Sequence, residues 1–477
     1  MRAMYGLGLA GLGATAALAL PYQAEHHTWR FHADHVLGTS LDIAVIAERP
    51  LAAALAIDAA RSEIQRLNRV LSAWRSDSEL MTLNSVSRHA ASQDLFAVIA
   101  ACEAWRVRTG GAYSARVGRV LQACGDRGWA YAANTAGLRL DPVTREIHRP
   151  EEIVFAVDGL AKGYTIDRAL EAASCIPGVE GAMVDIGGDL RCRGKAPKDG
   201  GWRIGLVNAG DPSDNALPQS QLLIGDRAVA TSGRSSRNQL TVSPLTGARA
   251  DHIAYATVVV GRATDADALA TAFSVLQPEQ SVALADSWPD VAARMITRDG
   301  QTHVSARWQD YCAGSSPVQV AQAADGSAWP AGFALNIEYD VPRISTGTYH
   351  NPYMALWITD ENRKLVRTLL VLGKEGRWRE ENYVYWRRFG RLDIKLVDSV
   401  TKPTRAPGHY TLKWDGLDDG GRKAPQGKYI LNIEASREKV GHTVQRVELM
   451  LGTDGAVVEA AAGEEIGKIR ATYGRGA

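Results

Sequence analysis

The 477-residue sequence predicts an α+β body followed by an all-β sandwich. Three observations support this fold class. Long runs with apolar residues at helical spacing share residues 25–315 with short strand patterns that end in glycine. Near residue 313 the composition changes to Ala, Ser, Gly and Pro, which is typical of a linker. Beyond it, alternating β-rich runs follow one another at fairly regular spacing, which favours a sandwich.

The predicted elements follow in order. Residues 39–47, "TSLDIAVIA", alternate like a strand. Helical spacing predicts three helices, and glycine or proline ends the second and third; they lie at 51–71, 94–109 and 164–176. Four short runs closed by glycine are predicted strands, at 181–187, 202–210, 227–233 and 255–261. The strands expected in the sandwich are 333–341, 353–360, 365–373, 408–419, 428–438 and 445–452.

The N-terminus resembles a secretion signal. It has a positive Met1-Arg2 start, an apolar Gly/Ala-rich run and a plausible cleavage site after Ala24. The apolar run is short for a membrane span, and a buried helix is the alternative. We therefore expect a periplasmic protein without an integral membrane segment in the mature chain. The expected segments are a signal at 1–24, a body at 25–315, a linker at 316–330 and a sandwich at 331–477.

The composition is that of a soluble globular protein, with 45% hydrophobic and 22% charged residues. A formal net charge of +1 gives no overall field that would favour nucleic acid, so no nucleic-acid partner is expected. The five cysteines are widely spaced and include no CxxC pair, which excludes an obvious zinc or redox motif. Most of them are expected to be small buried hydrophobes.

One stretch, "TDADALATAFSVL" at 264–276, combines acidic and hydroxyl residues with small apolar ones. Thr264 and Asp267 form a T-x-x-D pattern close to a capping box, so a capped core helix is one interpretation. Asp267 and Thr271 are also four residues apart and share a helical face. A carboxylate and a hydroxyl are hard oxygen donors, which suit Mg²⁺.

Three further stretches each have a structural and a functional interpretation. "VDGLAKGYTID" at 157–167 is expected to be a glycine-bearing turn into a helix, with Lys162 available for an anion. "MVDIGGDLRCRG" at 183–194 places two aspartates around a glycine pair. "AVATSGRSSR" at 228–237 ends a strand in hydroxyl groups that could hold phosphate oxygens or only make a turn.

The order of these motifs resembles the FAD:protein FMN transferases, the ApbE-type family, over about residues 35–300. The run comprises LGTS, LSAWRSDSEL, GGAYS, DGLAKGYTID, VDIGGDLR, AVATSG and DADALATA. The resemblance implies a T-fold-like flavin transferase body. It also implies that FAD is split at its pyrophosphate, that FMN passes to a Ser or Thr hydroxyl of an acceptor protein with an FMN-binding domain, and that AMP leaves. Mg²⁺ is the implied cofactor and FAD the substrate.

The resemblance also implies site residues. Asp267 and Thr271 would be side-chain ligands of the metal, with the Ala161 carbonyl as a third. Trp74 stands where the family commonly has tyrosine, and Leu37 stands at a methionine position. The residues at implied FAD contacts are Leu37, Trp74, Ala112, Tyr113, Ser114, Asp158, Lys162, Tyr164, Thr231, Ser232, Gly233 and Thr241.

The sequence departs from the family where a proton acceptor is expected. In "LTVSPLTG" at 240–247, Leu240 stands at a histidine position and Ser243 at an aspartate, while Ser114 replaces another aspartate. The catalytic base is therefore unassigned, and His252 is a weak candidate. An FAD pyrophosphatase giving FMN and AMP, or a non-catalytic periplasmic flavin-binding protein, remain alternatives. The acceptor pattern D-x-[ST]-x-A-T is absent from this chain, so the acceptor is expected to be another protein.

The C-terminal segment has its own signature. "WDGLDDGGRKAPQGKY" at 414–429 is similar to Ig-like domains, in which the Trp packs and the Asp and Gly residues make a hairpin. Residues 331–452 resemble the uncharacterised periplasmic domain DUF2271. Trp386 with Arg387, Arg388 and Arg391 could bind an acidic partner, although a solvated strand edge with positive residues is the favoured interpretation.

Overall fold

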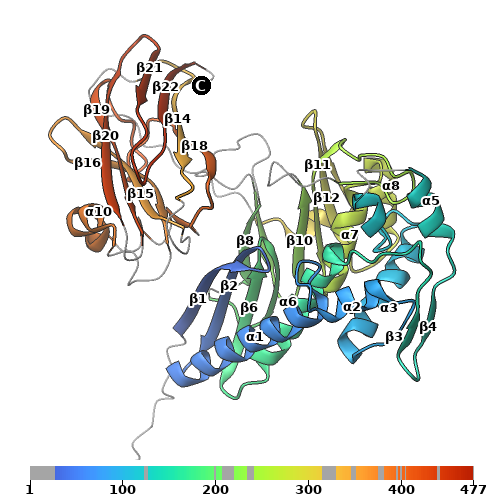
Figure 1. The fold of residues 1–477 in the computed structure, drawn as a ribbon. Coiled ribbons are helices and arrows are strands. Elements are labelled where there is room, and N and C mark those ends of the chain that lie inside the picture. Colours follow the sequence, from blue (N-terminus) through green and yellow to red (C-terminus); the bar gives the residue numbers. More distant parts are fainter. Residues whose placement is uncertain are drawn as a thin grey trace, which may run out of the picture.

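In the computed structural model the described residues form two bodies (Figure 1). The described residues are 27–122, 127–197, 200–206, 220–233, 241–313, 329–344, 351–373, 381–393, 396–397, 400–402, 404–437 and 441–475. The expected signal, most of the expected linker, Cys124 and Leu240 lie outside them. In the described part of the chain, no helix has the length and hydropathy needed to cross a membrane.

The first body is built on an eight-stranded antiparallel sheet. Its strands in spatial order are β1 (His27–Val36), β2 (Thr39–Ala47), β6 (Val179–Ile186), β7 (Asp189–Gly194), β10 (Ala228–Gly233), β11 (Ile253–Val260), β12 (Ala292–Thr297) and β13 (Thr302–Val304). Strand β2 shows that both faces are buried. Ile43 and Val45 belong to one hydrophobic cluster, whereas Ala44 and Ile46 belong to another, because successive side chains point to opposite faces.

Three helices cover one face of this sheet: α1 (Pro50–Leu71), α6 (Asp158–Ser174) and α7 (Ala263–Phe273). Helix α1 packs on β2, α6 packs on β6 and β7, and α7 packs on β10 and β11. Helix α6 contacts both α1 and α7, so it lies between them (Figure 1). The opposite face is covered by the hairpin of β8 (Trp202–Leu206) and β9 (Ser220–Ile224) together with Trp308.

The other elements of the body surround this core. The helices are α2 (Glu79–Ser85), α3 (Gln93–Arg108), α4 (Gly118–Gln122), α5 (Arg127–Thr135), α8 (Pro278–Asp286) and the 3₁₀ helix η1 (Trp308–Tyr311). A small sheet contains β3 (Arg88–Ala90), β5 (Glu146–His148) and β4 (Arg139–Asp141). The mixed α+β body predicted from the sequence is confirmed.

The stretch 157–167 was expected to be a glycine-bearing turn that enters a helix, and the turn is wrong, because α6 already begins at Asp158. Two glycines in this stretch favoured a turn in the sequence, since glycine weakens an isolated helix. In the fold, both glycines lie inside α6, on the side that α7 approaches. Lys162 and Gly163 are therefore rigid parts of a helix and not parts of a flexible loop.

The second body is a pair of β-sheets, which confirms the additional C-terminal β domain. The sheets are β18 (Gly408–Trp414), β14 (Phe333–Val341), β22 (Ile469–Arg475) and β21 (Ala456–Ala460), and β17 (Thr401–Lys402), β16 (Leu365–Leu372), β15 (Tyr353–Asp360), β19 (Gly427–Ser436) and β20 (His442–Leu451). Side chains of both sheets form one hydrophobic core. Trp414 is 1% exposed within it, and its Nε1 donates to the Leu417 carbonyl at 2.8 Å.

Two smaller expectations need correction. The arginine-rich segment is not a strand edge, because it forms the helix α10 (Tyr383–Arg388) and the 3₁₀ helix η2 (Gly390–Leu392). Tyr385 is buried against Trp357 of β15, and this contact packs the helix on the sheet. Of the four described cysteines, all of them free thiols, only Cys102 and Cys192 are buried.

Candidate active site

Helices α6 and α7 approach closely along Gly159 and Gly163. A Cβ on Gly163 would overlap the backbone carbonyl of Ala263, and a Cβ on Gly159 would lie 2.8 Å from Thr271 Oγ1. Glycine inside a helix costs roughly 1 kcal/mol relative to alanine. The close approach of the helices offsets this cost and brings one face of α7 against α6.

Asp267 is the central carboxylate on that face. It is 4% exposed, and its Oδ2 accepts a hydrogen bond from Gly163 N at 3.0 Å. The pKa of Asp267 is raised from 3.8 to about 7. Burial is the largest cause of this pKa shift and the charge of Asp189 adds to it, whereas Lys162 and the Gly163 N–H act in the opposite direction. Because ionising this carboxylate in a buried position is costly, a bound cation would stabilise it strongly.

Thr271 lies one turn after Asp267, with its Oγ1 3.4 Å from the Gly159 carbonyl oxygen. The carbonyl of Ala161 accepts the Thr165 hydroxyl at 2.8 Å, so metal binding through it would compete with that hydrogen bond. The carboxylate, hydroxyl and carbonyl are oxygen donors of the kind that Mg²⁺ prefers. Within the described ranges no group of three His, Cys, Asp or Glu residues could hold a metal. Mg²⁺ commonly needs only one or two carboxylates, because waters and substrate phosphates fill its other positions.

Lys162 supplies the positive charge of the site. Its Nζ lies 2.7 Å from Asp189 Oδ2. Burial opposes the charge, but Asp189 and Asp267 more than offset this and raise the pKa of Lys162 above its ordinary value. Asp189 Oδ1 also accepts the backbone N–H of Thr231 at 2.9 Å, so one carboxylate connects α6 to the end of β10. The pairing of Lys162 with Asp189 was not expected from the sequence.

The GGAYS segment lies close to these carboxylates. Tyr113 is 2% exposed, and its hydroxyl faces Cys102 Sγ at 3.1 Å. Burial raises the pKa of Tyr113, and the negative charges of Asp267 and Asp158 raise it further. Ala112 and Ser114 are buried as well. The segment is therefore near enough to Asp267 and Asp158 to feel their charges, and only a rearrangement would expose the Tyr113 ring to FAD.

Asp158 stands at the first turn of α6. Loss of hydration beside the protein raises the pKa of the Asp158 carboxyl, and the positive charge of Lys162 lowers it. Asp158, Lys162 and Asp267 thus influence one another electrostatically, as expected of residues in one site.

Two predicted flavin contacts are exposed. Trp74 is 92% exposed, on a loop whose backbone is held by Ser72 and Ser78. Ser72 Oγ accepts the N–H of Trp74 at 3.2 Å, and Ser78 Oγ donates to the Ser72 carbonyl at 2.7 Å. Leu37 is 36% exposed at the turn between β1 and β2, with a φ of 52°. Both side chains are available to a large planar ligand.

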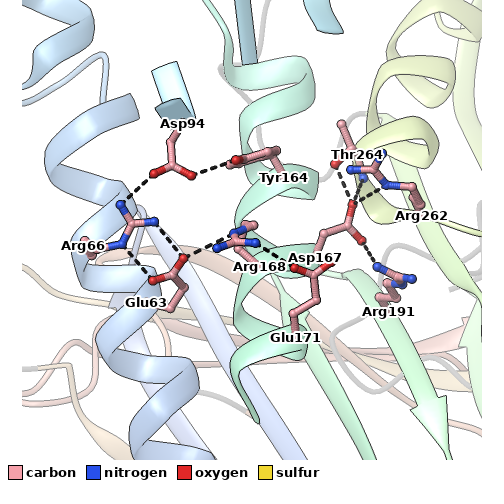
Figure 2. A network of polar contacts seen from close by, with 10 residues as sticks. All are labelled: Glu63, Arg66, Asp94, Tyr164, Asp167, Arg168, Glu171, Arg191, Arg262 and Thr264. Carbon is pink, nitrogen blue, oxygen red and sulfur yellow. Dashed lines mark hydrogen bonds and ion pairs between the residues drawn. The ribbon is translucent and has the colours of Figure 1, made fainter. Parts of the chain in front are cut away.

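Tyr164 and His252 do not join the Asp267 cluster. Tyr164 donates from its hydroxyl to Asp94 Oδ1 at 2.8 Å and points toward α1 and α3 (Figure 2). His252 Nε2 lies 2.9 Å from the Leu276 carbonyl oxygen. It lines a shallow pocket of about 390 Å³ whose lining residues do not include Lys162 or Asp267. The structure therefore gives no contact that supports Tyr164 as an FAD ligand or His252 as the base.

The remaining predicted contacts lie around the end of β10. Thr231, Ser232 and Gly233 are its last residues, and Thr231 Oγ1 lies 3.0 Å from Thr257 Oγ1. Thr241 follows the segment 234–240, which lies outside the described residues, and its carbonyl accepts the Ala250 N–H at 2.9 Å. No described contact joins Thr241 to the cluster.

The expected cap of α7 is also different. The helix begins at Ala263, and its N-cap residue Arg262 makes no side-chain cap bond. Thr264 is already inside the helix, and its hydroxyl donates to Asp167 at 2.6 Å. Sequence reasoning missed Asp167, because a cap supplied by another helix leaves no local pattern.

Solved structures of other proteins share the fold of the first body. The solved structures of Pseudomonas stutzeri flavinyl transferase ApbE in its apo form (TM-score 0.52, 22% identity) and of the Thermotoga maritima ApbE protein (TM-score 0.52, 24% identity) each match 60% of this chain. The matched region spans 98% and 99% of those two proteins, respectively. The first body therefore has the mixed α/β fold of the flavin transferases.

Curated relatives and family models are more specific. FAD:protein FMN transferase of Treponema pallidum is 27% identical over 321 residues, which are 57% of this chain and 86% of that protein. The enzyme of the same name from Vibrio cholerae is 30% identical over 146 residues, or 28% and 42% of the two chains. The ApbE family model matches residues 37–295, and the predicted periplasmic protein family DUF2271 matches residues 334–468. The chain belongs to the ApbE family.

Proposed function

We propose that this chain is an FAD:protein FMN transferase that requires Mg²⁺. It would transfer FMN from FAD to a Ser or Thr hydroxyl of an acceptor protein and release AMP. The observation that carries the proposal is the face of Asp267 and Thr271 on α7, held against Gly159 and Gly163 of α6. This face lies inside the segment that matches the ApbE family.

The proposed metal ligands are Asp267, Thr271 and the Ala161 carbonyl. When bound there, Mg²⁺ would neutralise charge on the pyrophosphate and on the departing phosphate of AMP. Lys162 would add a second positive charge near the phosphates, since Asp189 holds its Nζ in the cluster. Trp74 and Leu37 would contact the flavin, and Thr231, Ser232, Gly233 and Thr241 would contact other parts of FAD.

The proposed reaction is a displacement at phosphorus. The acceptor hydroxyl oxygen bonds to the FMN phosphorus, and the bond from that phosphorus to the bridging oxygen breaks. AMP leaves with the electron pair of that bond, and the hydroxyl proton passes to a base. No described residue is assigned as this base, because His252 makes its contact at Leu276 and Leu240 replaces the histidine implied by the family resemblance.

The finer features of the protein are part of the same proposal. We infer export by the signal at 1–24 and a periplasmic location, which the match to a predicted periplasmic family supports. We also infer a T-fold-like body at 25–315, a linker at 316–330 and an Ig-like sandwich at 331–477. The acceptor would be a separate protein carrying an FMN-binding domain.

The test is incubation of the purified chain with FAD, Mg²⁺ and an acceptor FMN-binding domain, followed by mass measurement of the acceptor. Covalent FMN on the acceptor and one AMP per FMN are expected. Asp267→Asn should abolish the transfer, whereas Asp265→Asn is the matched control, because Asp265 on the same helix bonds Trp105 Nε1 at 3.0 Å instead. AMP release without acceptor labelling would favour a pyrophosphatase, and intact bound FAD would favour a flavin-binding protein.

A further inference from the structure

Asp167 connects the two helices that carry the site. It lies on α6, is 1% exposed, and points at the first turn of α7 (Figure 2). Its Oδ1 accepts Ala263 N at 2.9 Å, and its Oδ2 accepts Thr264 N at 3.0 Å and the Thr264 hydroxyl at 2.6 Å. The carboxylate therefore binds free backbone N–H groups at the beginning of α7, a position normally served by a local N-cap residue.

Two arginines balance the charge of this buried carboxylate. Arg191 Nη1 lies 2.7 Å from Asp167 Oδ1, and Arg262 Nε lies 3.6 Å from Oδ2. Each oxygen thus has both a backbone donor and a cationic neighbour. A carboxylate at a helix N-terminus also interacts favourably with the helix dipole. Because Asp167 fills the N-terminus of α7, that terminus is not free to bind a phosphate.

The contacts of Asp167 with the first turn of α7 influence where Asp267 lies. Asp267 is one turn beyond Ala263 on α7, and Gly163 is one turn before Asp167 on α6. The two helices therefore exchange reciprocal bonds, since Asp167 of α6 accepts N–H groups of α7 and Asp267 of α7 accepts the N–H of Gly163 at 3.0 Å. We call the four hydrogen bonds between these helices the α6–α7 clasp: three to Asp167, from Ala263 N, Thr264 N and the Thr264 hydroxyl, and one to Asp267 from Gly163 N. They fix both the rotation and the axial position of α7 against α6.

We propose that Asp167 is a positioning residue, which aims Asp267 and Thr271 at the metal and pyrophosphate through the α6–α7 clasp. The inference rests on the proposed function for the identity of the ligand. The clasp itself does not depend on the proposed function, because its contacts are hydrogen bonds between residues of this chain. Residues that orient metal ligands typically change metal affinity about 10- to 100-fold when replaced.

The experiment uses the full chain and three variants. Asp167→Asn keeps the shape but removes the charge, and Thr264→Val removes only the hydroxyl contact, as a milder change that is expected to remain folded. Glu63→Gln is the control, because Glu63 belongs to the polar network on the α1 side of α6, where it bonds Arg66 at 2.8 Å (Figure 2). The affinity for Mn²⁺, measured by electron paramagnetic resonance in the presence of FAD, should weaken about 10-fold or more in Asp167→Asn. It should weaken less in Thr264→Val and stay unchanged in Glu63→Gln.

A second measurement separates the clasp from the proposed function. Hydrogen–deuterium exchange without metal should accelerate in Asp167→Asn in peptides covering both 263–273 and 159–166, and not in Glu63→Gln. Transfer by Asp167→Asn should recover at high Mg²⁺, with the KM for FAD changed less than about 2-fold. Faster exchange confined to the first turn of α7, with wild-type Mn²⁺ affinity, would overturn the positioning role. If the wild type itself bound no Mn²⁺, the proposed function would fail, while the exchange result would still decide whether Asp167 controls the Gly163–Asp267 contact.

Discussion

Replacing Asp267 with asparagine should stabilise the metal-free protein while it removes metal binding. Asparagine has nearly the same shape, and its side-chain oxygen can still accept the N–H of Gly163. It removes a negative charge that is buried beside Asp189 and Asp158. The variant therefore separates the role of the charge from the role of the packing.

The pH dependence follows from the pKa of Asp267, which is raised from 3.8 to about 7 by burial first and by neighbouring carboxylates second. A raised pKa in the folded state means that the protonated carboxyl favours folding. This contribution is complete below about pH 4 and is lost as the pH rises through about 7. At about 1.4 kcal/mol for each pKa unit, the wild type loses at most about 4–5 kcal/mol relative to the asparagine variant.

Thermal unfolding in EDTA tests this directly. The two proteins should have similar Tm values near pH 4, and at pH 8 Asp267→Asn should be higher by roughly 5–10 °C. Mg²⁺ should raise the Tm of the wild type and leave the variant unchanged. Asp265→Asn should behave as the wild type in its response to Mg²⁺. A difference between wild type and Asp267→Asn that does not change with pH would refute the electrostatic reasoning, and a Tm response of the variant to Mg²⁺ would refute the assigned ligand.

Three further changes have clear expected outcomes. Trp74→Ala should raise the KM for FAD about 10-fold through lost stacking, while the Tm stays the same because the ring is 92% exposed. Gly163→Ala should lower stability by about 2 kcal/mol or more and weaken Mg²⁺ binding, because its Cβ would overlap the backbone of α7. Gly225→Ala, which has open space around its Cβ, is the control measured in the same urea titration. Glu465→Gln should destabilise the C-terminal domain by about 3 kcal/mol in urea unfolding, since it removes the negative charge that Glu465 places against the buried Arg437 guanidinium, and flavin transfer should not change.

Local patterns predicted the parts of the site that depend on neighbours in sequence. Asp267 and Thr271 are four residues apart on one helix, so helical periodicity alone places them on one face, and in the structure this face meets α6. The FAD contact that the motif implies for Tyr164 stays a prediction. On α6 this tyrosine points toward Asp94, on the side of α1 and α3.

Partners that are distant in sequence could not be predicted. Asp189 is 27 residues from Lys162, and Asp167 is close to 100 residues from Thr264, yet both pairs form short contacts. Only the order of strands in the sheet brings these residues together, and no periodicity encodes that order. The glycines of α6 were also misinterpreted for this reason. Their cost is visible in the local sequence, whereas the helix that makes them necessary lies far along the chain.

The proposed metal site must keep a buried carboxylate in position although no positive charge pairs with it directly. Asp267 alone in a buried position would favour protonation, which is the state that its raised pKa indicates for the metal-free chain. Lys162 does not pair with Asp267 directly, because Asp189 holds the ammonium group at 2.7 Å. Asp189 thus pairs with the cation nearest to Asp267, the proposed metal ligand, and Asp167 bonds the first turn of α7 to α6. Both of these carboxylates have cationic partners of their own. Asp267 is the buried carboxylate that has no direct cationic partner among the described residues, so a bound Mg²⁺ is the charge that would stabilise its ionised form.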